Sequence, residues 1–191
     1  DVSRGTTIEQ SGARVSTIEH TLAACVGLEI DNVLIQLDGP EAPIMDGSSI
    51  QFVNVLKEAG YEEQNALRDF FEVQDGLFYR EAARNVEIAA LPLDDYRVTV
   101  MIDYNSPVLG SQHASITNIG QFEKEIASCR TFCFLHELEM LYKNNLIRGG
   151  DLNNAIVIVD RVVEPHELDN IAKMLGKPKV EVKKEGILNN I

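Results

Sequence analysis

The chain has 191 residues, of which 45% are hydrophobic and 25% are charged, which is enough for one ordinary domain or two small ones. Its 17 Lys and Arg residues against 30 Asp and Glu residues give a formal net charge of −13. This balance argues against a nucleic-acid-binding protein, which carries a basic face. No apolar run approaches the roughly 20 residues that span a bilayer, so the sequence predicts no membrane segment.

The first sixty residues predict a helix, a strand and a second helix. Residues 16–26 form the first helix, with Ser16 as N-cap and Glu19 completing a capping box. Residues 32–37 are rich in branched apolar side chains and predict a strand. Residues 50–59 predict the second helix, which follows two serines and precedes a glycine.

A polar, charged stretch at residues 61–68 marks the expected boundary between two domains, 1–66 and 67–191. An Asp-Gly pair after residues 70–73 predicts a hairpin with residues 77–80. The later predicted strands are residues 86–90, 97–104, 155–160 and 180–183. The later predicted helices are residues 119–129, 135–144 and 165–175. Strands followed by helices in each half predict an α+β fold rather than a doubly wound parallel sheet.

The three cysteines, Cys25, Cys129 and Cys133, form no CxxC pair. The polar opening of the chain shows no signal peptide, so we expect free thiols in a reducing cytoplasm. Cys25 and Cys129 lie in apolar stretches predicted to be helical, and we expect both to be buried.

Glu19 and His20 are the first pair with a possible role in catalysis. A metal hydrolase needs a ligand that holds the ion and a carboxylate that takes a proton from the attacking water. The alternative is a purely structural role, in which Glu19 caps the helix and His20 is a surface residue. The other histidines, His113, His136 and His166, lie in no HxxxD, HxH or HExxH arrangement, and each is expected to be solvated.

Three further segments carry unusual residues. Asp46-Gly47 predicts a turn, and Asp46 or Ser48 can cap the following helix, which gives Asp46 a role in shape rather than chemistry. In residues 130–134, the Thr131 hydroxyl is of a kind that donates to an oxyanion, although a tight connection with core aromatics explains the pattern as well. Gly149-Gly150 permits close approach of a ligand or simply makes a turn.

Linked segments in the same order resemble the family of UDP-3-O-acyl-N-acetylglucosamine deacetylase, LpxC. They are residues 15–24, 27–28, 30–32, 39–48, 130–132, 134, 149–150 and 155–157. The resemblance covers nearly the whole chain but only about the middle of the family pattern. It implies a soluble zinc enzyme of lipid A synthesis in the cytoplasm of a Gram-negative bacterium, with an acylated UDP-amino sugar as substrate. It also implies two related domains, each a layer of helices packed on a β-sheet, with an inserted segment in the second.

The resemblance also implies roles for individual residues. Glu19 matches the general base, His20 the first zinc ligand, and Thr131 the hydroxyl that steadies the tetrahedral oxyanion. Tyr104 and Phe132 match positions that border the nucleotide-sugar pocket. Positions in the inserted segment match the lining of the acyl-chain passage: Leu138, Ile147, Gly150, Ala155 and Val157. In the implied mechanism, zinc lowers the pKa of a bound water, Glu19 takes its proton and Thr131 donates to the oxyanion.

The chain also departs from the family pattern. Cys133 replaces a usual glycine, Ser106 stands where Asn-His-Pro is common, and residues 163–190 resemble an inserted helix and strand. The family's other two zinc ligands and its general-acid histidine have no counterpart here, so we expect this chain alone to be inactive. Two alternatives remain: a noncatalytic module that binds a UDP-sugar or acyl chain, and a different metal hydrolase that uses His113 or His136. Exposed sheet edges predict association between chains.

Overall fold

The computed structural model describes residues 2, 5–143 and 151–190. Helices and strands occupy separate short segments, which confirms the α+β class. The helices are α1 (Glu19–Gly27), α2 (Ile50–Ala59), α3 (Phe122–Glu125), α4 (Leu135–Lys143) and α5 (Pro165–Met174). The strands are β1 (Ile8–Gln10), β2 (Ala13–Val15), β3 (Leu77–Glu81), β4 (Val86–Ala90), β5 (Val98–Asp103), β6 (Ser111–Ile116), β7 (Phe132–Phe134), β8 (Ile156–Ile158), β9 (Val180–Val182) and β10 (Leu188–Asn190). Of the described helices, none is long and apolar enough to cross a membrane.

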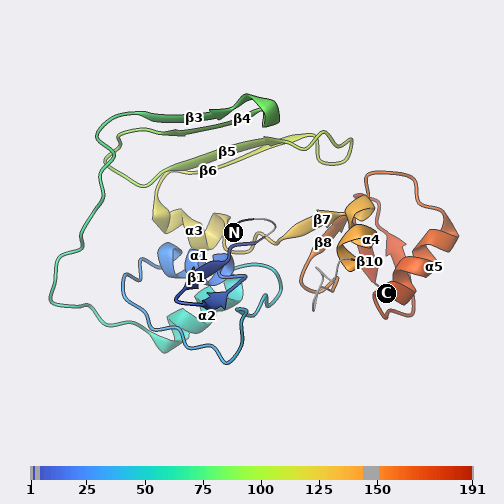
Figure 1. Cartoon of the computed structure of the whole chain (residues 1–191), viewed down its shortest axis with the longest axis horizontal. Helices are drawn as coiled ribbons and strands as arrows, with labels where there is room; N and C mark the ends of the chain where they lie inside the picture. Colours follow the sequence, from blue (N-terminus) through green and yellow to red (C-terminus); the bar gives the residue numbers. More distant parts are fainter. Residues whose placement is uncertain (1, 3–4, 144–150, 191) are drawn as a thin grey trace.

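The described strands form two-stranded sheets. β1–β2, β3–β4, β5–β6 and β9–β10 are antiparallel, and β7–β8 is parallel. The β7–β8 pair needs a crossover connection, and α4 lies in that connection (Figure 1). A bridge between Ile158 and Ile187 attaches β8 to the segment before β10.

The first core lies among α1, α2 and α3. Ala24, Val53, Phe122 and Ala127 are buried in it. A Cβ atom at Gly27 would lie 2.0 Å from the Phe122 ring, so only glycine lets the end of α1 approach α3 this closely. Figure 1 shows the β3–β4 and β5–β6 ribbons on one side of these helices. An apolar hollow of about 400 Å³ separates β5–β6 from α1 and α3.

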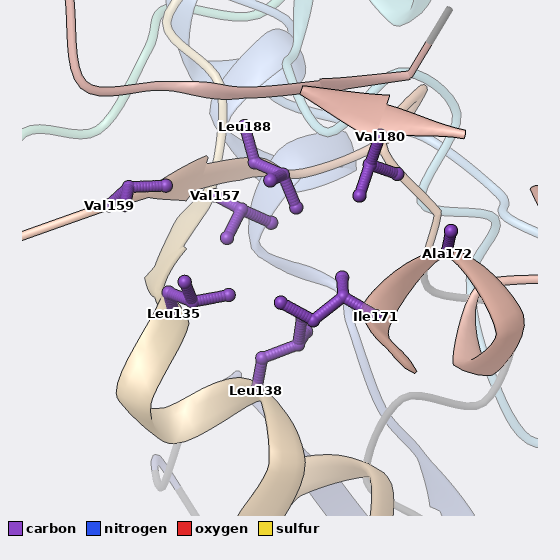
Figure 2. Packing of buried hydrophobic residues seen from close by; sticks show 8 residues of the cluster. All are labelled: Leu135, Leu138, Val157, Val159, Ile171, Ala172, Val180 and Leu188. Atoms are coloured by element: carbon purple, nitrogen blue, oxygen red, sulfur yellow. The ribbon is translucent and has the colours of Figure 1, made fainter. Parts of the chain in front are cut away.

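The second core lies among α4, α5, β8, β9 and β10 (Figure 2). Its buried members are apolar side chains from all of these elements: Leu135, Leu138, Val157, Val159, Ile171, Ala172, Val180 and Leu188. The predicted helix at residues 165–175 is confirmed as α5, with Pro165 in its first turn and a capping box between Glu164 and Glu167. Proline suits that position because its missing N–H would have no partner there.

Two predictions about the first half and one about a cysteine are wrong. The helix α1 begins at Glu19, and Ser16 does not cap it. Ser16 instead forms a bridge with Glu41 and donates its N–H to the Pro40 carbonyl, while Thr17 turns the chain with φ +58°. Residues 32–37 form no strand, because within the described part of the chain no segment pairs with them. Cys25 is buried as expected, whereas Cys129 is exposed in the irregular segment after α3.

The predictions for the second half differ in position. Residues 70–73 are not a strand, and the hairpin instead pairs β3 with β4 across a 3-10 turn at Ala82–Arg84. The predicted helix at residues 119–129 is only a 3-10 turn followed by α3. The strands β1, β2, β6 and β10 were missed, because polar residues interrupt their apolar pattern. The apolar strand β7 was also missed, because residues 130–134 were interpreted as a connection between two helices. The predicted helix at 135–144 and the strands at 86–90, 97–104, 155–160 and 180–183 are confirmed within two residues at each end.

Acid should weaken the anchoring of α5. The Arg161 guanidinium, with the Glu164 N–H, lowers the pKa of Glu167 from 4.5 to about 2. A carboxylate with a lowered folded-state pKa stabilises the fold above pH 4.5, and this stabilisation is lost as the pH falls toward 2. We expect the difference in urea midpoint between the wild type and Glu167→Gln to shrink over that range. A difference that stays constant from pH 5 to pH 2 would contradict this assignment.

Candidate functional site

Glu19 and His20 open helix α1, and both are half-buried. The Glu19 carboxylate accepts a hydrogen bond from the Thr6 N–H at 2.9 Å, which ties it to the segment before β1. A carboxylate is also favoured at the N-terminal end of a helix, where the backbone N–H groups carry partial positive charge. Adjacent helical residues point about 100° apart, so the two side chains can border one cavity.

The described residues do not provide a full zinc site. Nowhere in residues 2, 5–143 and 151–190 do three His, Cys, Asp or Glu side chains lie close enough together to hold a metal ion. His113 is exposed on β6, opposite Met101 on β5. His136 lies 3.2 Å from the Asp160 carboxylate, and these two residues form only a pair. A catalytic zinc needs three protein ligands. Among the described residues, His20 has no second or third metal ligand beside it.

Asp46 and Gly47 form a turn, as expected from the sequence. Asp46 does not cap α2, whose first N–H, that of Ile50, donates to the Ser48 hydroxyl at 3.3 Å. Gly47 has φ +82° and donates its N–H to the Ile44 carbonyl. One Asp46 carboxylate oxygen accepts from the Ser48 N–H at 3.1 Å and from the Ser48 hydroxyl at 2.8 Å. Burial opposes ionisation, but these hydrogen bonds and the nearby Arg130 charge hold the pKa of Asp46 below its ordinary value. Asp46 is therefore engaged in the turn itself.

Arg130 joins this turn to the segment before β8, a role that its sequence context does not indicate. Its Nε donates to the Asp46 carbonyl at 2.7 Å, and its Nη2 donates to the Asn153 carbonyl at 2.7 Å. The next residue, Thr131, is held by two main-chain hydrogen bonds. The Thr131 N–H donates to the Gly47 carbonyl at 2.7 Å, and the Thr131 carbonyl accepts from the Ile156 N–H at 3.0 Å. Thr131 is therefore held between the turn and β8.

Four rings form a continuous row beside β7. Tyr104 and Phe132 meet edge to face with ring centroids 5.5 Å apart, and Phe132 meets Phe134 in the same way at 5.8 Å. The Phe134 ring then stacks on the His136 imidazole at 5.4 Å. The structure thus brings together Tyr104 and Phe132, which the resemblance assigns to one pocket. The row extends from them to the start of α4.

A pocket of about 300 Å³ begins where this aromatic row ends. It is lined by residues from α4 and from the C-terminal part of the chain: Leu135, His136, Leu138, Arg161, Glu167 and Ile171. Leu138 and Val157 are both only 3% exposed and belong to the second core. Ala155 is half-buried just before β8, two residues from Val157. Ile147 and Gly150, also expected to line the acyl passage, lie outside the described residues.

The two departures from the family pattern have local explanations. Cys133 lies in the middle of β7, where it pairs with Val157 in an extended strand and packs against the second core. A glycine is not required in that conformation. Ser106 is buried, and its hydroxyl accepts from the Val108 and Leu109 N–H groups. It therefore shapes the turn between β5 and β6.

The sequence model of LpxC, described as UDP-3-O-acyl N-acetylglycosamine deacetylase, matches residues 1–171 of the 191. The chain belongs to the LpxC family. The bifunctional enzyme LpxC/FabZ of Chlorobaculum tepidum is 43% identical over 193 residues, covering all of this chain and 41% of that protein. The bifunctional enzyme LpxC/FabZ of Bacteroides thetaiotaomicron is 37% identical over 190 residues, again covering all of this chain and 41% of that protein.

The UDP-3-O-acyl-N-acetylglucosamine deacetylase of Nitratidesulfovibrio vulgaris is 43% identical over 155 residues, or 81% of this chain and 50% of that protein. This LpxC-family chain therefore spans half or less of the length of these three relatives. The LpxC match ends at residue 171, inside α5, whereas the two bifunctional relatives align with the whole chain. The segment after α5 is thus shared with those two relatives and lies beyond the LpxC match.

Proposed function

We propose that the protein carrying this chain is a zinc-dependent deacetylase that hydrolyses the N-acetyl group of UDP-3-O-acyl-N-acetylglucosamine. The observation that carries this proposal is membership of the LpxC family over residues 1–171, which include Glu19 and His20. Relatives named for this activity are 43% and 42% identical to the chain over 155 and 167 aligned residues. The reaction belongs to lipid A synthesis, and we place the enzyme in the cytoplasm of a Gram-negative bacterium.

In this proposal Glu19 takes the proton from the attacking water. Its carboxylate is half-buried, and the hydrogen bond from the Thr6 N–H holds it in place. Thr131 donates its hydroxyl hydrogen to the oxyanion that develops on the acetyl carbonyl. Such a donor works best when it is fixed before the reaction begins, and Thr131 is fixed by main-chain bonds to Gly47 and Ile156. His20 supplies one metal ligand.

The substrate would lie along the aromatic row. Tyr104 and Phe132 would border the nucleotide-sugar part, which suits flat rings that pack against apolar sugar faces. The acyl chain would lie toward α4 and β8, where Leu138, Ala155 and Val157 are placed. Ile147 and Gly150 complete the proposed lining. The row connects the two ends of this site, because His136 both stacks on Phe134 and lines the pocket beside Leu138.

We also propose that the 191 residues alone do not turn over substrate. This proposal is supported by the described residues, among which no group of three possible metal ligands includes His20. The isolated chain would then act as a binding module for the UDP-sugar and acyl chain. Neither His113 nor His136 lies in a described metal-holding group, so no observation favours a different hydrolase built on them. The proposed domains are residues 1–66 and 67–191.

Metal content tests this reading directly. After extensive dialysis, elemental analysis of the purified 191-residue chain should give close to zero zinc, because a single histidine does not hold the ion tightly. Close to one tightly bound zinc per chain would contradict the proposal that the ligand set is incomplete. The same measurement on His20→Ala, His113→Ala and His136→Ala variants would then identify the ligands.

Exposed apolar residues on β3 and β4 support the proposed association between chains. Phe78 is 77% exposed and Ile88 is 61% exposed, and both lie on a ribbon that has no third strand among the described residues. An apolar two-stranded ribbon with free edges is a surface on which further strands or side chains can pack.

A further inference from the structure

Arg130 binds two segments of the chain that lie far from it in sequence. Its Nε donates to the Asp46 carbonyl at 2.7 Å, across 84 positions. Its Nη2 donates to the Asn153 carbonyl at 2.7 Å and to the Leu152 carbonyl at 3.4 Å, across 23 and 22 positions. One planar guanidinium therefore holds the turn before α2 against the segment before β8. A lysine ammonium, with its donors on a single atom, does not reproduce this geometry.

Thr131 lies at the junction that Arg130 holds together. The Thr131 N–H donates to the Gly47 carbonyl at 2.7 Å. The Thr131 methyl group also lies close to the turn, because a Cβ at Gly47 would be 3.0 Å from the Thr131 Cγ2 atom. Methyl and hydroxyl groups of threonine occupy two of three staggered positions on the same carbon. With the methyl group against Gly47, the position of the turn decides where the hydroxyl points.

The junction is tight, so a small movement of the turn is transmitted to Thr131. A Cβ at Gly47 would lie 2.1 Å from the Asn154 carbonyl oxygen, so the turn and the segment before β8 approach closely through their main chains. An oxyanion donor works only over a narrow range of distances, about 2.7 to 3.1 Å from the oxyanion. Misplacement of a reacting group by about 1 Å can cost about 10² in rate.

We propose that Arg130 is a positioning residue for the deacetylation: it holds the Asp46-Gly47 turn in place and so directs the Thr131 hydroxyl at the oxyanion. This inference rests on the proposed function, which assigns the oxyanion to Thr131. Arg130 acts through Thr131 and touches no reacting atom in this proposal. Its loss should lower kcat with KM unchanged, because the hydroxyl meets charge that develops only in the transition state.

The test is a double-mutant cycle in the full-length, zinc-loaded deacetylase that carries this chain. Thr131→Val removes the hydroxyl and keeps the shape of the side chain, so it should lower kcat by about 10² to 10³. Arg130→Lys keeps the charge but not the planar donors, and should lower kcat about tenfold. In the Thr131→Val background, Arg130→Lys should lower kcat by less than about twofold, because no hydroxyl is left to misdirect.

Arg68→Lys is the matched control. Arg68 also joins distant segments, since it donates to the Glu29 carbonyl at 2.6 Å and to the Asp31 carboxylate at 3.0 Å. It has no role in the proposed site, so its variant should keep the wild-type kcat. The unfolding midpoint of each variant separates loss of fold from misdirection of the hydroxyl.

Amide hydrogen exchange in the 191-residue chain gives a readout that depends on neither turnover nor zinc. Arg130→Lys should speed exchange of the Thr131 N–H about tenfold, because it frees the turn that carries the Gly47 acceptor. The Leu175 N–H, which donates to the Ile171 carbonyl in the second core, should exchange at the wild-type rate.

Three results would each overturn the inference: a Thr131 N–H that exchanges no faster in Arg130→Lys, a wild-type kcat in that variant, or equal losses of kcat in the two backgrounds. A loss that appears in KM instead of kcat would do the same, because it would place the effect of Arg130 on substrate binding. Thr131→Val with the wild-type kcat would count against the proposed role of Thr131 itself, and the positioning role would fall with it.

Discussion

Replacing Gly47 with alanine is expected to destabilise the fold by about 2 to 5 kcal/mol. Gly47 has φ +82°, a conformation that costs an L-residue about 1 to 2 kcal/mol. The new Cβ would also lie 2.1 Å from the Asn154 carbonyl oxygen. That oxygen belongs to the main chain, so it cannot turn aside as a flexible side chain would. Relief of the clash would separate the turn from the segment that Arg130 joins to it. Urea unfolding gives the free-energy difference.

Gly12→Ala provides the control for this prediction. Gly12 has φ +83°, almost the same as Gly47, but a Cβ there meets no atom within 4 Å. Its substitution should therefore cost only the conformational part, about 1 to 2 kcal/mol. Equal losses for the two variants would show that the close approach of Asn154 contributes nothing, and would contradict the described junction.

Glu19→Gln should lower the deacetylase kcat of the protein that carries this chain by about 10² to 10⁴, the range for loss of a general base. The amide keeps the size of the side chain but cannot take a proton from water. The side-chain oxygen can still accept the hydrogen bond from the Thr6 N–H, so the fold should change little. Rates are measured on acylated UDP-N-acetylglucosamine with the released acetate as readout.

Glu41→Gln is the control for charge and composition. Glu41 is exposed and accepts a hydrogen bond from the Thr17 hydroxyl, and no catalytic role is proposed for it. Its variant should keep the wild-type rate. Zinc content and unfolding midpoint are measured for both variants, so that loss of metal or fold is separated from loss of the base. A Glu19→Gln enzyme with more than about half the wild-type kcat would exclude Glu19 as the base.

The sequence predicted those elements whose local pattern agrees with their surroundings. The helix α5 carries its own start signals in Glu164, Pro165 and Glu167, and it forms where expected. Residues 32–37 have the apolar pattern of a strand but no described neighbour to pair with. Strand formation depends on a partner that can be far away in the chain, so no local pattern decides it. The same dependence explains why the polar strand β6, which pairs with β5, was missed.

In the candidate site, too, residue types could be predicted from the sequence, whereas contacts between distant residues could not. The types of Glu19, His20 and Thr131 are visible in the sequence, and the resemblance supplied their roles. The role of Arg130 could not be predicted, because it donates to main-chain carbonyls. Every residue type has such a carbonyl, so the sequence does not indicate which positions accept the hydrogen bonds. The position of Ile171 in the pocket wall also depends on how α5 packs against α4, and this arrangement is set by the second core as a whole.

The link between Arg130 and Asp46 also has a consequence for the order of folding. The two residues are 84 positions apart in the chain. At 5 to 20 residues per second, a ribosome needs roughly 4 to 17 s to reach Arg130 after it has made Asp46. During that interval the turn before α2 lacks the partner that fastens it. Until Arg130 has been synthesised, the α1–α2 region of the nascent chain therefore lacks this contact and is accessible to chaperones and proteases.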